Sequence, residues 1–267
     1  MKQILLNNGR RIAYYLEGSG DGPLLALLHG FCEDASFWEN MLPGLKNIPL
    51  LRIDLPGFGD SDLPPAPVME DYADAVRAVL NTLSVGRCVL IGHSMGGYVA
   101  LEFAEKYPGL LAGYGLVHSH PREDTPERKE NRRRGIDMLR SGKRDLYLAQ
   151  LFPGLFAEAF ARAKPEVINA LIEQGKRQTA EGIAAALESM IGRKEHLDTL
   201  RHAACPVLFL LGSEDPIIPS EWVFQAALMP AVADVHVLSG VGHMGMLEAP
   251  EKSVEIVRQF WEFCARR

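Results

Sequence analysis

Residues 88–100, which read CVLIGHSMGGYVA, decide how the rest of the chain is interpreted. The apolar run Cys88–Ile91 predicts a short strand, and the residues from Met95 onward predict a helix. Between them, residues 92–96 match the pattern G-x-S-x-G. A serine on so sharp a turn has a strained backbone, and glycine two residues away on either side avoids a clash because it lacks a Cβ. The pattern therefore predicts that the Ser94 hydroxyl lies beyond the end of a sheet, beside helix N–H groups that stabilise a developing negative charge.

The composition is that of an ordinary globular protein. The chain has 267 residues, 47% hydrophobic and 23% charged, which is enough for one α/β domain with an inserted subdomain. The formal net charge of -6 does not indicate binding to nucleic acid or to an anionic membrane surface. No apolar run has the length of a membrane span, and we expect no signal peptide. The scattered cysteines predict reduced thiols, a cytoplasmic protein and no metal site; they are Cys32, Cys88, Cys205 and Cys264.

Strand patterns alternate with helix patterns over most of the chain, and this alternation predicts a mostly parallel sheet with crossover helices. Asn-Gly at residues 8–9 predicts a hairpin over residues 3–17. The expected strands are 3–6, 11–16, 24–28, 50–53, 88–91, 110–117, 206–211 and 235–238. The expected helices are 36–45, 68–83, 95–107, 220–228 and 249–263.

Residues 121–194 lack strand signals and predict several amphipathic helices. We therefore divide the chain into a core, residues 1–120 and 195–267, and a helical insertion, residues 121–194. The insertion begins with a run of mixed charges at residues 127–134, which we expect to form a solvated face.

Polar residues follow nearly every predicted strand. In a parallel sheet the carboxyl ends of the strands meet at one edge, which is where ligands bind. We therefore expect one site built from His29-Gly30-Phe31, Asp54, Ser94, His118-Ser119-His120, Asp215 and His243.

Three of these residues have the types and the chain order of a nucleophile, an acid and a base. A serine hydroxyl is a weak nucleophile unless a base takes its proton, and the base needs a third group to orient it. We assign Ser94 as nucleophile, His243 as base and then acid, and Asp215 as the group that holds Nδ1 of His243. For the acid, Asp124 after the preceding strand and the neighbouring Glu214 remain alternatives.

The sequence resembles the serine α/β-hydrolases that carry a helical cap. The matching motifs are HGF at 29–31, DLPGFGDS at 54–61, GHSMGG at 92–97, GSEDPIIP at 212–219 and GVGHM at 240–244. The resemblance implies a mostly parallel eight-stranded sheet flanked by helices, with residues 121–194 as the cap. It also implies an oxyanion hole formed by the backbone N–H groups of Phe31 and Met95. His29 and His93 most often orient loops in this family.

The expected activity is that of a carboxylesterase, which hydrolyses a small-molecule acyl ester through an acyl-enzyme without metal or cofactor. A thioester, amide, lactone or carbon–carbon bond is an alternative target. A ligand sensor with slow turnover is an alternative of another class. Phe152, Phe156, Phe160 and Met190 can line the acyl side, although packing within the helices explains them equally well. His118 and Met244 are further candidates for substrate contact, and whether His118, His120 or Cys32 line the pocket stays open.

Overall fold

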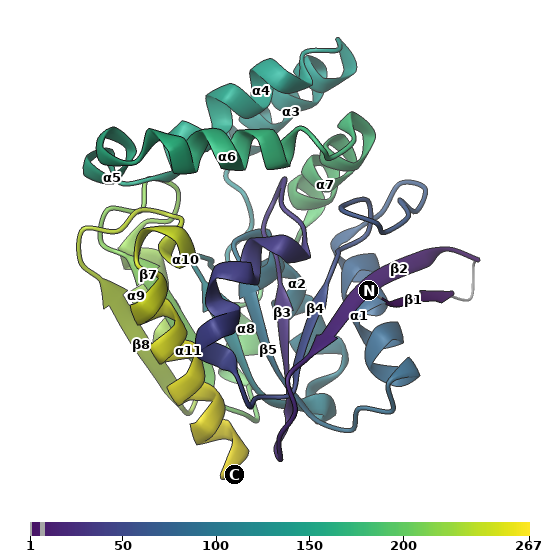
Figure 1. Ribbon diagram of the computed structural model, residues 1–267, viewed down its shortest axis with the longest axis vertical. Helices are drawn as coiled ribbons and strands as arrows, with labels where there is room; N and C mark the ends of the chain where they lie inside the picture. Colours follow the sequence, from purple (N-terminus) through teal and green to yellow (C-terminus); the bar gives the residue numbers. More distant parts are fainter. Residues whose placement is uncertain (1, 6–8) are drawn as a thin grey trace.

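The computed structural model describes residues 2–5 and 9–267, and its centre is an eight-stranded sheet (Figure 1). The strand order is β1-β2-β4-β3-β5-β6-β7-β8, in which neighbouring strands from β4 to β8 run parallel. This confirms the mostly parallel sheet expected from the sequence. The strands are β1 (Lys2–Leu5), β2 (Arg11–Glu17), β3 (Leu24–Leu28), β4 (Leu50–Ile53), β5 (Cys88–His93), β6 (Leu111–Val117), β7 (Val207–Gly212) and β8 (Ala233–Leu238).

The expected hairpin is present as the antiparallel pair β1 and β2, with Lys2 opposite Tyr14 and Leu5 opposite Arg11. Most of its turn, residues 6–8, lies outside the described part of the chain.

Helices cover both faces of the sheet because the central strands are mostly apolar and are buried along almost their whole length. Every residue of β5 is buried, as is every residue of β7. One face packs against α1 (Met69–Thr82) and α2 (Met95–Lys106), and α8 (Leu197–Arg201) packs against α2. The other packs against α11 (Pro250–Ala265) and the 3₁₀ helix η1 (Ala35–Leu45), whereas α9 (Ser220–Ala227) packs against β7 and β8.

The chain between β6 and β7 is helical, and Figure 1 shows most of these helices lying beyond one end of the sheet. The first, α3, begins at Pro126, and the side chain of its N-cap, Thr125, accepts a hydrogen bond from Arg128 N at 3.3 Å. The helices are α3 (Pro126–Arg140), α4 (Arg144–Leu151), α5 (Glu158–Ala163), α6 (Pro165–Gly175) and α7 (Ala180–Gly192), with the 3₁₀ turn η3 (Phe152–Leu155). Two short elements complete the chain, η2 (Pro108–Leu110) and α10 (Gly245–Glu248).

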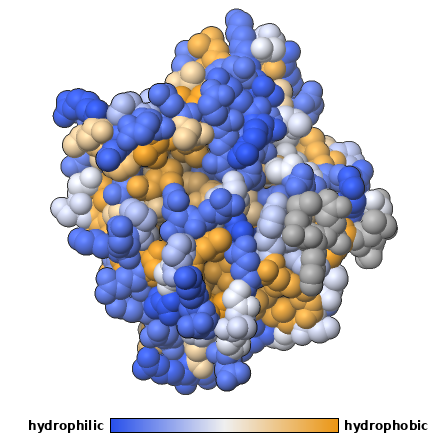
Figure 2. Space-filling model, in the orientation of Figure 1, coloured by the Kyte–Doolittle hydropathy of each residue, from blue (hydrophilic) through white to orange (hydrophobic). Residues whose placement is uncertain are grey.

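The surface in Figure 2 shows hydrophobic residues in separate patches among hydrophilic ones, as on most globular proteins. Within residues 2–5 and 9–267, no helix combines the length and the hydropathy needed to cross a bilayer.

Candidate active site

Ser94 occupies a strained turn between β5 and α2. Its φ of 49° lies in the left-handed region that non-glycine residues rarely adopt. A Cβ on Gly92 would overlap the carbonyl oxygen of Gly96, and a Cβ on Gly96 would overlap the carbonyl oxygen of Leu28. The turn is tied to β6, because Ser94 N donates to the Val117 carbonyl at 2.9 Å. Both glycines of the pattern are thus required by close backbone approaches, as the spacing predicts.

The structure brings Ser94, His243 and Asp215 into one line of hydrogen bonds. His243 Nε2 lies 2.9 Å from Ser94 Oγ, and His243 Nδ1 lies 2.9 Å from Asp215 Oδ2. Since the ionised carboxylate only accepts, Nδ1 carries the proton and Nε2 is free to accept from the serine hydroxyl. The two side chains behind Ser94 are almost inaccessible, with 3% of His243 and 1% of Asp215 exposed. The arrangement can deprotonate the hydroxyl during attack on an electrophile.

The loop that carries His243 is held by a residue that the sequence analysis missed, Glu248. Its carboxylate accepts from Gly242 N at 3.0 Å and from Met244 N at 3.1 Å, on either side of the histidine. The same carboxylate accepts from Ala157 N at 3.0 Å, and His243 N donates to the Leu155 carbonyl at 2.7 Å. The histidine loop is therefore fastened directly to the helical insertion. Glu248 lies six residues after Gly242 and four after Met244, and this spacing in the sequence does not by itself indicate that the acid binds the loop.

Two backbone N–H groups near Ser94 have no acceptor in the described part of the chain, those of Phe31 and Met95. Met95 is the first residue of α2, so its N–H has no partner within the helix. The turn of Phe31 is fixed by the buried Glu33, whose carboxylate accepts from Gly30 N at 2.6 Å and lies 3.2 Å from His93 Nδ1. These two groups are the ones that the sequence resemblance assigned to an oxyanion hole.

His29 and His93 orient loops, as the resemblance implies. His29 Nε2 accepts from Leu55 N at 2.9 Å, which connects the loops after β3 and β4. His93 Nε2 lies 3.1 Å from the His243 carbonyl oxygen and so supports the histidine loop from β5.

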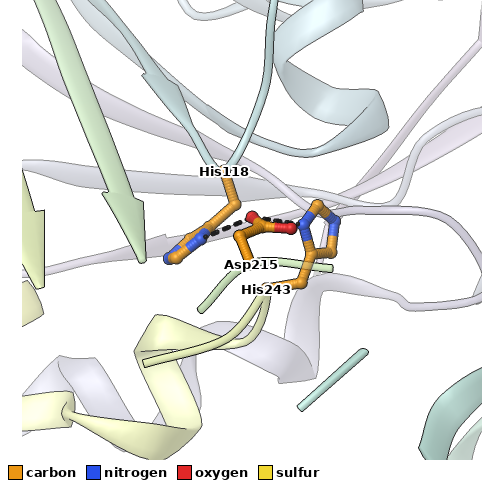
Figure 3. A group of neighbouring side chains, drawn as sticks. All are labelled: His118, Asp215 and His243. Carbon is orange, nitrogen blue, oxygen red and sulfur yellow. Dashed lines mark hydrogen bonds and ion pairs between the residues drawn. The ribbon is translucent and has the colours of Figure 1, made fainter. Parts of the chain in front are cut away.

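A second histidine shares the carboxylate of Asp215. Figure 3 shows His118 and His243 on opposite sides of that carboxylate, each with a ring nitrogen directed at it. His118 Nδ1 lies 3.2 Å from Oδ2, and Oδ1 accepts from Ile217 N and Ile218 N at 2.8 and 2.9 Å. Burial alone would raise the pKa of Asp215, but the interactions with His243 and His118 outweigh it and hold the pKa well below its ordinary value. The carboxylate therefore stays ionised at neutral pH.

His118 is itself completely buried, and burial lowers the pKa of its imidazole from 6.5 to about 4, although the Asp215 hydrogen bond acts in the opposite direction. At neutral pH the ring is therefore uncharged and donates its Nδ1 proton to Asp215. Its Nε2 has no hydrogen-bond partner within residues 2–5 and 9–267. His118 is a positioning residue for Asp215 rather than a group that faces the cavity.

We expect His118 to make the folded protein less stable as the pH falls from 6.5 towards 4. In that range the unfolded chain binds a proton at residue 118 that the folded protein excludes, so stability rises with pH. The full effect is on the order of 3 kcal/mol. The free energy of unfolding in urea at pH 7 and pH 4.5 should therefore differ less in His118→Asn than in the wild type. His202→Asn, at an exposed histidine, is the control, and an equal difference in wild type and His118→Asn would contradict the prediction.

Ser94 and His243 line a cavity of about 580 Å³ between the sheet edge and the helical insertion. This volume lies in the range of small-molecule sites, roughly 300–1,000 Å³. Its apolar and aromatic wall comes from both parts of the chain, and it includes Phe31, Tyr98, Tyr147, Leu151, Leu155, Leu187, Met190, Ile217 and Trp222.

Four residues predicted to contact substrate do not line this cavity: His118, Phe152, Phe156 and Met244. Phe152 is completely buried and its ring lies against Gly175 within the insertion, whereas Phe156 stacks on Phe160 with centroids 5.5 Å apart. These two aromatic side chains therefore pack within the insertion rather than in the cavity wall. His120 and Cys32 are also absent from the lining, whereas Met190 is part of it. Burial raises the pKa of the Cys32 thiol well above its ordinary value.

The charged run at residues 127–134 is only partly a solvated face. Arg133 and Arg134 are exposed, but Arg128 and Arg132 line the cavity. The expectation was wrong for these two because α3 turns one of its sides towards the site.

Asp124 and Glu214, the alternative acids, lie elsewhere. Asp124 is buried between Arg132 and Arg193, at 2.5 and 2.9 Å. Glu214 is exposed, although it directly precedes Asp215.

This chain is similar to known proteins in sequence and in fold. A model of the alpha/beta hydrolase family matches residues 25–256. The solved structure of a thermophilic esterase from Thermogutta terrifontis, described as malate bound, has a TM-score of 0.93 at 32% sequence identity and covers 99% of this chain and 100% of that one.

Two curated relatives have names that describe other activities. A 2-hydroxy-6-oxononadienedioate/2-hydroxy-6-oxononatrienedioate hydrolase from Burkholderia vietnamiensis is 27% identical over 278 residues, covering 94% of this chain and 90% of the relative. A biotin biosynthesis bifunctional protein from Cellvibrio japonicus is 26% identical over 253 residues, 91% of this chain, and the chain spans only 48% of that relative's length.

Proposed function

Since the chain belongs to the alpha/beta hydrolase family, we propose that it is a serine hydrolase, specifically a carboxylesterase that acts through an acyl-enzyme. The observation that carries the proposal is the unbroken hydrogen-bonded line from Ser94 Oγ through His243 to Asp215, with 2.9 Å at each step. It ends in a cavity large enough for a small or medium acyl ester.

In the proposed reaction, Ser94 Oγ attacks the carbonyl carbon of the ester while His243 Nε2 takes the hydroxyl proton. The negative charge that forms on the carbonyl oxygen is stabilised by the free N–H groups of Phe31 and Met95. His243 then gives its proton to the leaving alcohol oxygen as the C–O bond breaks, and the acyl group remains on Ser94. His243 Nε2 then takes a proton from water, which attacks the acyl carbon. As the bond from that carbon to Ser94 Oγ breaks, His243 gives the proton to Oγ, and the acid is released with the hydroxyl restored.

Asp215 supports both halves of this cycle without changing its own protonation. Its charge stabilises the imidazolium that forms at each proton transfer, and its hydrogen bond keeps the His243 ring in the tautomer that faces Ser94. The two N–H groups at its Oδ1 and the His118 ring hold the carboxylate in place.

We also propose that residues 121–194 act as a cap that selects the substrate. Support comes from the cavity wall, because Tyr147, Leu187 and Met190 belong to this segment and face the same space as Ser94. The choice of an ester as the target draws on the esterase from Thermogutta terrifontis, at 32% identity. The relative from Burkholderia vietnamiensis has a different named substrate, so the bond that is cleaved has to be measured.

The proposal is tested with 4-nitrophenyl acetate, butyrate and octanoate and a fluorophosphonate probe. We expect a rapid burst of about one 4-nitrophenol per active site followed by steady turnover, as an acyl-enzyme requires. The fluorophosphonate should modify the peptide that contains Ser94, as located by mass spectrometry. The absence of both turnover and labelling would refute the proposal that the protein is a serine hydrolase. A burst without steady turnover would favour the ligand sensor instead.

A further inference from the structure

Arg128 places a positive charge in the wall of the cavity that also contains Ser94. It lies in the first turn of α3, where the Thr125 side chain caps the helix. The wall therefore includes a charged guanidinium that comes from the helical insertion. Most of the other side chains in the wall are apolar or aromatic.

The Arg128 guanidinium is held in a defined orientation. One Nη2 proton is donated to the carbonyl oxygen of Ile217, in the loop after β7. The guanidinium carbon lies 5.0 Å from the centre of the Trp222 ring, over its face. A planar cation held by a carbonyl and an aromatic face has lost much of its rotational freedom before any ligand arrives, which reduces the cost of binding one.

Among the residues that the structure describes, most of the N–H groups of this guanidinium find no acceptor. Its other near neighbour is Nε2 of His120, 3.4 Å from Nη1. His120 Nδ1 accepts from Arg122 N at 3.2 Å, so a neutral His120 carries its proton on Nε2 and cannot accept there. No carboxylate forms an ion pair with Arg128 in the described part of the chain.

The neighbouring charges do not compensate for Arg128. Arg132 and Arg193 share a single buried carboxylate, that of Asp124. Burial lowers the pKa of His120 well below its ordinary value, and the positive charges of Arg193 and Arg128 act in the same direction. Glu127 also lines the cavity, but this residue is exposed, so water and salt screen its charge. The other acid in the lining, Glu33, is already bound to Gly30 and His93.

We propose that Arg128 is the binding site for a carboxylate on the substrate, so that the preferred esters are half-esters of dicarboxylic acids. This inference rests on the proposed esterase function and specifies its substrate class. The free N–H groups of a guanidinium match the two oxygens of a carboxylate, and such charge-assisted hydrogen bonds are about twice as strong as neutral ones. Apolar residues such as Leu155, Leu187 and Met190 contact the hydrocarbon chain between the two ends.

The test compares mono-4-nitrophenyl adipate, which has a free carboxylate, with methyl 4-nitrophenyl adipate, in which that carboxylate is methylated and uncharged. For the wild type we expect kcat/KM to be about 10- to 100-fold higher for the half-ester. Arg128→Gln should reduce that ratio at least about 10-fold. Arg134→Gln, at an exposed arginine on the same helix that does not line the cavity, should keep the ratio of the wild type. If Arg128→Gln does not fold, Arg128→Met, which can still pack on Trp222, takes its place.

A ratio that is unchanged in the Arg128 variant would overturn the proposal, even if the melting temperature falls, because Arg128 would then only fasten α3 to the loop after β7. A wild type that prefers the neutral diester would overturn it as well.

Binding without turnover separates this proposal from the esterase activity. Monomethyl adipate is titrated into Ser94→Ala and into Ser94→Ala/Arg128→Gln by calorimetry. We expect Kd to rise at least about 10-fold in the double variant. That result would support the carboxylate site even if the wild type hydrolysed neither ester, whereas no binding or equal Kd values would reject it.

Discussion

We expect Ser94→Ala to lower kcat/KM for 4-nitrophenyl butyrate by about 10⁴- to 10⁶-fold. Without the hydroxyl, His243 has no nucleophile to activate, and an acyl-enzyme cannot form. The residual rate would come from the free N–H groups of Phe31 and Met95 and from binding in the cavity, which still favour attack by water. The measurement is the steady-state rate after purification that excludes contaminating esterases, together with loss of fluorophosphonate labelling.

The control for this variant is Ser141→Ala, at an exposed serine at the end of α3. Both variants should keep the circular dichroism spectrum and melting temperature of the wild type. Ser141 is exposed, and within residues 2–5 and 9–267 Ser94 Oγ makes one side-chain hydrogen bond, to His243. Activity of Ser94→Ala within about 10-fold of the wild type would mean that the nucleophile lies elsewhere.

The second large effect is expected for Asp215→Asn, a loss of about 10³- to 10⁴-fold in kcat. The side-chain oxygen of an asparagine can still accept from Ile217 N and Ile218 N, which leaves the NH₂ group facing His243 Nδ1. An amide that donates to Nδ1 moves the imidazole proton to Nε2, where it faces Ser94 and prevents the ring from acting as a base. The charge that stabilises the imidazolium is lost at the same time.

Asp124→Asn is the matched comparison, since Asp124 is the other acid that the sequence left open. It lies between Arg132 and Arg193 rather than beside His243, so its loss should reduce stability through two uncompensated guanidinium groups. Its effect on kcat, corrected for the folded fraction, should be far smaller than that of Asp215→Asn. If kcat, corrected for the folded fraction, fell more in Asp124→Asn than in Asp215→Asn, Asp124 rather than Asp215 would be the acid that supports the catalytic histidine.

The fold was predictable because its signals are local. A short, continuous apolar run such as Leu24–Leu28 favours a central strand, and all but one residue of this strand is buried. The two glycines around Ser94 are required by backbone approaches within a few residues and from β3, and this requirement has a short sequence signature. Predicted ends of elements differ from the observed ones by a residue or two, as at Leu111, because hydrogen bonding at the ends depends on neighbouring strands.

The site was predictable only in part, and the reason is visible in the helical insertion. Periodicity shows that Phe152 and Arg128 lie on amphipathic helices, but not which side meets the helix core and which meets the cavity. Phe152 fills the core, whereas Arg128 faces the cavity. Glu248 and His118 were assigned no positioning role for a related reason, because their partners lie on other elements and leave no pattern at a fixed spacing.

The amino-acid sequence by itself determined the alternation of strands and helices, the strained turn at Ser94 and the set of polar residues that follow the strands. These properties depend on backbone sterics and hydrophobic periodicity within a dozen residues. Tertiary structure alone decided that Asp215 rather than Asp124 faces His243, that His118 lies behind that carboxylate, and that Arg128 enters the cavity. Those contacts join residues 28 to 97 positions apart, and only the order of strands in the sheet and the packing of the insertion over its edge bring them together.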